Sequence, residues 1–88
     1  MLRPSHTAQF KRDYKLQYKR HKDLIRLDNI MVKLVKEEEL LAQQQDHSLY
    51  GNYKGYRECH IEPDWLLIYK IEGDSICFTR TGTHADLF

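Results

Sequence analysis

The sequence predicts a single α+β domain over residues 1–88, in which two N-terminal helices pack on one face of a small twisted antiparallel sheet. The first half carries apolar residues at helical spacing, whereas the second half carries three short strand-like runs separated by turn residues. A chain of 88 residues has room for one modest core, so we expect no second domain.

The first expected helix follows Pro4 and runs to about His21, with Ser5 and Thr7 as candidate N-caps. A short strand at Met1–Arg3 is a possible extension of the sheet ahead of this helix. Aromatic residues recur at four-residue spacing and are expected to face inward: Phe10, Tyr14 and Tyr18.

The second expected helix begins near Asp23 and ends among the glutamates at 37–39. Its apolar residues recur at i, i+3, i+4, i+7 and i+8, which is the pattern of a face packed on a core. They are Leu27, Ile30, Met31, Leu34 and Val35.

The polar stretch 43–55 predicts a long loop, and it contains His47. Strand-like runs follow at 56–62, 65–71 and 75–81. Turn residues at 63–64 and 73–74 separate these runs, which favours consecutive antiparallel pairing. The tail at 82–88 is too short for a further element, although its apolar end is expected to dock.

Charge is distributed unevenly along the chain, although the net charge is only +1. Residues 1–36 hold ten Lys and Arg against three Asp, whereas residues 37–88 hold four against ten Asp and Glu. Cations on the first helix could bind phosphate groups or form a solvated surface, and the sequence leaves both readings open. The cations in question are Lys11, Arg12, Lys15, Lys19, Arg20 and Lys22.

Strand alternation places Glu58 and His60 on one face, together with Tyr56 and Glu62. An exposed polar sheet face is the plain alternative to a site. Arg80 shares its parity with apolar neighbours, which indicates a bend in the strand or a position at the sheet rim.

Several other site types are poorly supported. A zinc site from His47, Cys59, His60 and His84 is conceivable, but the paired spacings of structural zinc sites are missing. We find no glycine-rich phosphate loop and no nucleophile elbow. Two cysteines do not make a disulfide framework, and we expect no cofactor or metal.

Four motifs carry a family resemblance that covers nearly the whole chain. They lie at Asp46–Leu49 (DHxL), Gly51–Arg57 (GxxKGxR), Cys59–Lys70 (CHIEPDWLLIYK) and Arg80–Phe88 (RTGTHADLF). The chain resembles the YafQ branch of the RelE/ParE superfamily, which contains toxins of bacterial type II toxin–antitoxin modules.

The resemblance implies a RelE-like microbial RNase fold and ribosome-dependent cleavage of mRNA in the A site. Because the RNA supplies its own nucleophile, we expect this cleavage to be metal-independent. It also implies a cognate DinJ- or RelB-like antitoxin as partner, with DNA bound only through the toxin–antitoxin complex. The implied catalytic set is His47, Glu58, His60, Asp64, Arg80, His84 and Phe88. The expected RNA-binding set is Lys11, Arg12, Lys15, Lys19, Arg20, Lys54, Arg57 and Trp65, with Trp65 equally suited to the core.

Cleavage by the 2′-hydroxyl of RNA needs a base, a cation on the phosphate and an acid for the leaving oxygen. Arg80 suits the phosphate and His84 the acid. The base could be Glu58, His60 or His47, and Asp64 could orient one of these two histidines. A non-catalytic module that binds RNA, the ribosome or an antitoxin is the alternative function. The chain shows no signal peptide and no membrane-spanning run, so we expect it in the bacterial cytoplasm.

Overall fold

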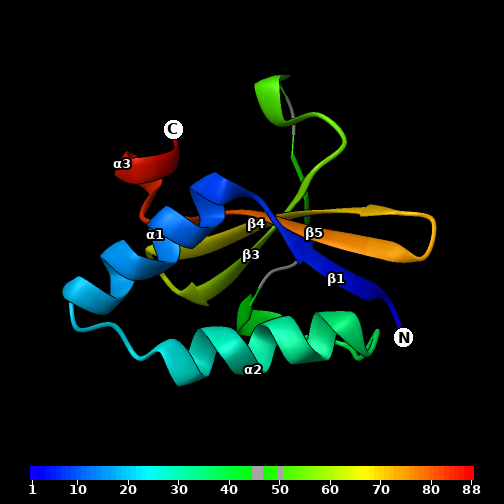
Figure 1. Cartoon of the computed structure of the whole chain (residues 1–88), viewed down its shortest axis with the longest axis horizontal. Coiled ribbons are helices and arrows are strands. Elements are labelled where there is room, and N and C mark those ends of the chain that lie inside the picture. The colour runs from blue at the N-terminus through cyan, green and yellow to red at the C-terminus, as the bar shows by residue number, and fades with distance from the viewer. Residues whose placement is uncertain (45–46, 50) are drawn as a thin grey trace.

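The computed structural model describes residues 1–44, 47–49 and 51–88, and Figure 1 shows its arrangement. In chain order the elements are β1 (Arg3–His6), α1 (Ala8–Lys19), α2 (Leu24–Val35), the 3-10 turn η1 (Ala42–Gln44), β2 (His47–Ser48), the 3-10 turn η2 (Gly51–Tyr53), β3 (Arg57–Glu62), β4 (Trp65–Glu72), β5 (Ser75–Gly82) and α3 (His84–Leu87). Among the described helices, none is long and apolar enough to cross a membrane.

Both predicted N-terminal helices are confirmed, and each begins at a side-chain cap. Thr7 Oγ1 accepts the amide of Phe10 at 2.9 Å, and Asp23 Oδ1 accepts the amide of Ile25 at 3.1 Å. These bonds satisfy backbone donors that have no partner within the helix itself. His21 has a φ of 62° at the turn between the helices, a left-handed conformation that helps to reverse the chain.

The predicted α+β class is confirmed, with one correction at the sheet edge. The strand order is β1-β5-β4-β3-β2, and β3, β4 and β5 pair antiparallel as predicted. The extra strand lies at Arg3–His6 rather than at residues 1–3, and it runs parallel to β5, so the sheet is mixed. The two hairpins leave one edge of β5 unpaired, and β1 pairs with the first half of that edge.

The stretch predicted as a loop contains one short strand. His47 and Ser48 form β2 and pair antiparallel with Glu58 and Arg57. Two polar residues give no alternating pattern, so the sequence carried no signal for this strand. Asp46 of the first motif lies outside the described residues.

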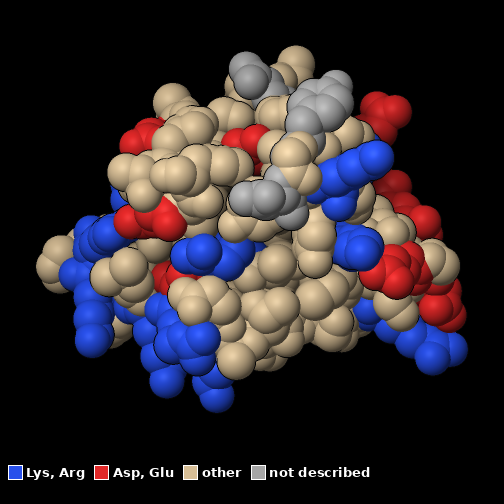
Figure 2. Space-filling view, turned by 90° about the horizontal axis from the view of Figure 1, so that it is seen from above, with Lys and Arg blue, Asp and Glu red and all other residues tan. Residues whose placement is uncertain are grey.

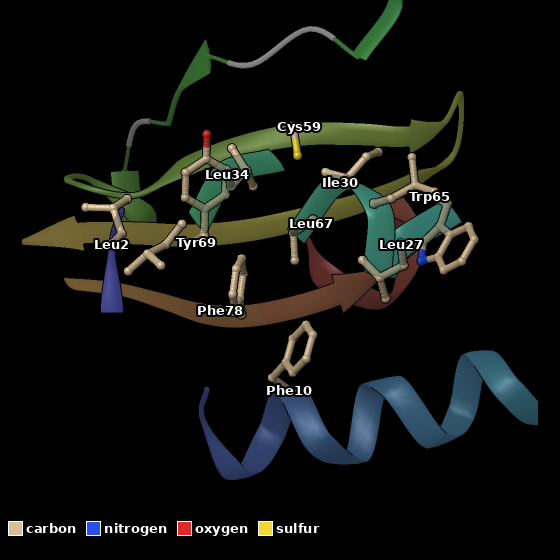
Figure 3. Close-up of a cluster of buried hydrophobic side chains, with 12 residues drawn as sticks. Leu2, Phe10, Leu27, Ile30, Leu34, Cys59, Trp65, Leu67, Tyr69 and Phe78 are labelled. Atoms are coloured by element: carbon tan, nitrogen blue, oxygen red, sulfur yellow. The ribbon is translucent and has the colours of Figure 1, made fainter. Parts of the chain in front are cut away.

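Helix α2 packs its apolar face against the sheet, as predicted, with Leu27, Ile30 and Leu34 buried. Figure 3 shows Leu27 and Ile30 beside Trp65 and Leu67 of β4. A smaller cluster forms on the opposite face of the sheet from Leu66, Ile68 and Leu87. The sheet is therefore covered on one face by α2 and in part on the other by α3.

The inward face of α1 differs from the predicted aromatic stripe. Phe10 is buried and packs toward Phe78, as Figure 3 shows, but Tyr18 is 71% exposed. The other buried residues of α1 are Asp13 and Gln17, which follow Phe10 at i+3 and i+7. Tyr14 also packs against the core, so the predicted stripe is confirmed for Phe10 and Tyr14 and wrong for Tyr18. The polar residues Asp13 and Gln17 were missed because only apolar side chains were expected to face inward.

Trp65 belongs to the core, which corrects its expected role as an RNA contact. Its side chain has 0% exposure, and its Nε1 donates to Thr81 Oγ1 at 3.0 Å. Thr81 Oγ1 in turn donates to the carbonyl of Leu66 at 2.8 Å. A fully buried indole has no face available for stacking on a base.

The C-terminal tail forms the short helix α3, contrary to the prediction of no further element. Thr83 and Asp86 make a reciprocal capping box, in which each side chain accepts an amide from the other residue. The expected docking of the apolar end is confirmed for Leu87, which is 6% exposed, whereas Phe88 remains 64% exposed.

Candidate active site

Two irregularities in the sheet determine which side chains reach its outer face, the face that carries Leu66 and Ile68. The register of β4 and β5 shifts between Tyr69↔Phe78 and Ile68↔Arg80, so Arg80 no longer shares the face of Phe78. Of the two predicted alternatives, a bend in the strand or a position at the sheet rim, the register shift supports the bend. A second shift follows His60 in β3, and Glu62 turns away to form ion pairs with Lys22 and Arg26. The expected grouping of Glu62 with Glu58 was therefore wrong.

Glu58 lies between two histidines on the outer face. Its Oε2 is 3.2 Å from His47 Nε2, and its Oε1 is 3.9 Å from His60 Nε2. The predicted pairing of Glu58 with His60 is confirmed, and β2 adds His47 because it pairs directly with Glu58. Glu58 is only 5% exposed, so little of its carboxylate is open to solvent.

Asp64 and His84 form a second acid–imidazole pair beside the first. Asp64 Oδ1 accepts the amide of His84 at 2.9 Å and lies 2.6 Å from His84 Nδ1. The amide and the ring of His84 together lower the pKa of Asp64. Asp64 was expected to orient His47 or His60, the histidines considered as base, and this prediction was wrong because Asp64 pairs with His84.

The three histidines form a row across the outer face. Ring centroids lie 6.2 Å apart for His47 and His60 and 6.1 Å apart for His60 and His84. Phe88 continues the row at 6.4 Å from His84, and its ring meets Tyr53 edge-on at 5.6 Å. Tyr53 was not among the predicted site residues, although its place between two glycines in a polar loop is unusual for an aromatic residue.

Arg80 is held by Asp13 of α1, a residue that the sequence did not predict to take part in the site. Arg80 Nε donates to Asp13 Oδ2 at 2.7 Å, and Nη2 donates to Oδ1 at 3.3 Å. The pKa of Arg80 is raised by its hydrogen bond to Asp13 and, to a smaller extent, by Tyr53. The available signal was that Asp13 is the only carboxylate in an otherwise basic helix.

The basic residues expected to bind RNA occupy several parts of the surface. The predicted cations of α1 are exposed, namely Lys11, Arg12, Lys15 and Lys19. Figure 2 shows Lys and Arg gathered at the end of the molecule that carries the turn between α1 and α2. Arg20 differs, because its guanidinium pairs with Asp86 of α3 at 2.6 and 3.0 Å and helps to hold that helix in place.

The structure does not bring Arg57 to the histidine row. It alternates with Glu58, shares the helix-covered side of the sheet with Cys59, and donates to Ser48 Oγ at 3.1 Å. Lys54 is exposed in the segment before β3.

The geometry does not support the conceivable zinc site. Cys59 is buried, and strand alternation places it on the opposite side of β3 from His60. Across residues 1–44, 47–49 and 51–88, no three His, Cys, Asp or Glu side chains are grouped so that they could hold a metal ion.

A family model described as a bacterial toxin of type II toxin–antitoxin systems, YafQ, matches residues 2–88. The chain belongs to the YafQ toxin family. The mRNA interferase toxin YafQ of Escherichia coli K12 is 48% identical over 84 residues, which cover 94% of this chain and 91% of that protein. The resemblance carried by the four motifs is thereby confirmed.

Solved structures show the same YafQ fold. The E. coli DinJ–YafQ complex contains a chain with a TM-score of 0.93 and 45% identity, covering 100% of this chain and 99% of that one. A metal-bound toxin from Helicobacter pylori has a TM-score of 0.93 at 36% identity, with 100% of each chain covered. In this YafQ-family chain, three of the motifs, together with Glu58 just before the third motif, supply the side chains on the outer side of the sheet. They are His47, Glu58, His60, Asp64, Arg80, His84 and Phe88.

Proposed function

We propose that this YafQ-family toxin is a ribosome-dependent endoribonuclease that cleaves translated mRNA in the A site and so inhibits translation and growth. The observation that carries the proposal is the placement of two acid–imidazole groups, Glu58 with His47 and His60, and Asp64 with His84, side by side on the outer face. The name of the E. coli relative, an mRNA interferase toxin, supports the same activity.

In the proposed reaction the RNA supplies its own nucleophile. A base removes the proton of a 2′-hydroxyl, the 2′-oxygen attacks the adjacent phosphorus, and the bond to the 5′-oxygen breaks. An acid protonates that 5′-oxygen as it leaves, and the other product ends in a 2′,3′-cyclic phosphate. The protein must therefore supply one base, one acid and a cation for the phosphate oxygens.

His84 is the proposed acid. When its ring is protonated, Nδ1–H donates to Asp64 and Nε2–H remains available for the leaving oxygen. The lowered pKa of Asp64 keeps this carboxylate charged, so it remains a hydrogen-bond acceptor that orients the ring of His84.

The base lies in the Glu58 group. Glu58 can accept a proton directly, or it can hold His47 or His60 in the orientation that accepts one. The burial of Glu58 favours the second role, because a carboxylate that is 5% exposed and covered by His47 has little room to meet a substrate.

Arg80 is the proposed phosphate ligand, because its planar donors match phosphate oxygens and its charge does not titrate. Phe88 is the proposed stacking surface for a base next to the cleavage site. Its 64% exposure and its position beside His84 leave its ring open to such a contact.

A ribosome-programmed cleavage assay tests these assignments with single variants. We expect His84→Ala to abolish cleavage while the protein remains folded, whereas His6→Ala, which removes an exposed histidine on β1, should cleave normally. Comparison of Glu58→Gln with His60→Ala and His47→Ala identifies the base. Full activity of a folded His84→Ala variant would contradict the proposed mechanism.

Primer extension on translated messages separates cleavage from mere binding. New 5′ ends that require the active ribosome support the endonuclease, whereas growth arrest without new ends supports the alternative of a non-catalytic module that binds RNA, the ribosome or an antitoxin. The proposed reaction needs no metal or cofactor, so a chelator should leave cleavage unchanged. Loss of cleavage with chelator and recovery with zinc would show that cleavage depends on a metal ion.

The proposed partners are the ribosome, its mRNA and a cognate DinJ- or RelB-like antitoxin, which places the toxin in the bacterial cytoplasm. The E. coli relative forms a complex with DinJ, which supports an antitoxin of that type. Contact with DNA is expected only through the toxin–antitoxin complex. Co-purification with the product of an adjacent gene, followed by toxicity when that gene is removed, tests the pairing.

A further inference from the structure

The buried face of α1 contains a carboxylate that no catalytic step requires. Asp13 is 5% exposed and belongs to a helix whose other charged residues face solvent. A carboxylate is costly to bury unless strong donors surround it. The groups that donate hydrogen bonds to Asp13 therefore indicate which interaction its burial serves.

Four hydrogen bonds converge on Asp13. Its Oδ2 accepts Arg80 Nε at 2.7 Å and the amide of Thr81 at 3.2 Å, and its Oδ1 accepts Arg80 Nη2 at 3.3 Å. Gln9 Nε2 donates to Oδ1 at 3.0 Å from one turn earlier in α1, and Gln9 Oε1 accepts from Arg12. The carboxylate is thus fixed from several directions at once.

The sheet explains why Asp13 can reach Arg80. Strand β1 pairs with β5 only as far as Phe78, so the last residues of β5 have an open edge. Helix α1 covers that edge, with Thr7 Oγ1 donating to the carbonyl of Thr79 at 2.8 Å and Asp13 accepting the amide of Thr81. The bulge before Arg80 places its side chain on the outer face, and from there the guanidinium reaches Asp13 at this edge.

The exposure of the two partners is unequal. The side chain of Asp13 is 7% exposed, whereas that of Arg80 is 24% exposed. A guanidinium has five N–H donors, and Asp13 engages one on Nε and one on Nη2, so three remain for other acceptors. Tyr53 also interacts with Arg80 and raises its pKa slightly, and the ring of Tyr53 contacts Phe88.

We propose that Asp13 is a positioning residue that holds the guanidinium of Arg80 in the plane in which its remaining donors meet the scissile phosphate. The inference rests on the proposed role of Arg80 in RNA cleavage. Two bonds to one carboxylate fix the rotation of the planar group, which a single bond would leave free. A fixed donor array loses less entropy when the transition state forms.

A double-mutant cycle in the ribosome-programmed cleavage assay tests the coupling. We expect Asp13→Asn to lower kcat by about tenfold to a hundredfold, the effect of misplacing a catalytic group. If Asp13 acts only through Arg80, the Asp13→Asn/Arg80→Ala protein should cleave no more slowly than Arg80→Ala alone. Independent multiplication of the two losses would overturn the proposal.

Chemical rescue supplies a readout that a merely structural role would not change. Added guanidinium, at concentrations far below those that unfold proteins, should partly restore cleavage to Arg80→Ala, because Asp13 remains to seat it. The same addition should not restore cleavage to Asp13→Asn/Arg80→Ala. Equal rescue of both proteins would overturn the proposal.

Matched variants control for folding. Asp28→Asn removes a carboxylate that accepts from Tyr14 of α1 at 3.0 Å but lies away from Arg80, so its kcat should equal that of the unmodified protein. Asp13→Glu keeps the charge while moving the carboxylate, and it is the second variant to use if Asp13→Asn fails to fold. We expect Asp13→Glu to fold and to have a reduced kcat. Full activity of folded Asp13→Glu and Asp13→Asn would refute the inference, although Arg80 would keep its assigned role. Full activity of Arg80→Ala would instead refute both.

Discussion

Phe88 and Leu87 are adjacent, yet the structure predicts opposite consequences for their removal. Phe88 is 64% exposed and contacts the rings of Tyr53 and His84, whereas Leu87 is 6% exposed in the cluster with Leu66 and Ile68. We therefore expect Phe88→Ala to affect cleavage more than stability, and Leu87→Ala to affect stability most.

The magnitudes follow from burial. Complete burial of a Phe side chain stabilises a protein by about 1.5–3 kcal/mol, so Phe88, about one-third buried, should contribute roughly 0.5–1 kcal/mol. Loss of one base–aromatic stack costs about 1–3 kcal/mol, which is roughly 5- to 150-fold in kcat/KM. Leu87→Ala should cost about 2–5 kcal/mol of unfolding free energy, because it opens a cavity on the outer face.

Two measurements decide between these expectations. Urea denaturation gives the free energy of unfolding for each variant, and ribosome-programmed cleavage gives kcat/KM for the folded protein. Phe88→Trp keeps a stacking ring and should retain most of the activity. Unchanged cleavage by Phe88→Ala, or a stability loss equal to that of Leu87→Ala, would refute the assignment of Phe88 as a base-stacking residue.

Three further predictions concern other parts of the structure. The ion pair with Arg20 lowers the pKa of Asp86, so the contribution of Asp86 to stability is present above its unfolded pKa and is lost as pH falls. The gap in melting temperature between the unmodified protein and Asp86→Asn should therefore shrink below about pH 4. A gap that does not change with pH would contradict this prediction. Trp65→Phe removes the hydrogen bond to Thr81 and should lower the unfolding free energy by about 1–3 kcal/mol, while the folded fraction cleaves normally; reduced cleavage by folded protein would restore Trp65 as an RNA contact. Both side-chain polar atoms of Gln17 are buried without a hydrogen-bond partner in the described parts of the chain. Gln17→Leu should therefore raise the unfolding free energy, measured by urea denaturation, by about 1–2 kcal/mol. A decrease would contradict the idea that these unpaired atoms destabilise the fold.

Patterns of local periodicity predicted most of the fold. The apolar stripe of α2, its start near Asp23, the cap at Thr7 and the turn residues between the strands all act within a few residues of sequence. The parallel strand β1 was misplaced because its partner, β5, lies about 70 residues away, and nothing local identifies such a pairing.

Local patterns also predicted part of the candidate site. Alternation along β3 correctly placed Glu58 beside His60, since both lie on one strand before its bulge. Tyr53 and Asp13 were missed as site residues, because each reaches Arg80 from an element distant in sequence.

By itself the sequence determined the α+β class, the family motifs and the identities of the acid, base and cation candidates. Only the tertiary structure decided that Asp64 pairs with His84, that Trp65 is core and that α1 supplies a carboxylate to Arg80. The physical reason is that alternation and helical spacing describe one element at a time. Bulges and open strand edges, which determine the side chains that meet across elements, arise only when the sheet assembles.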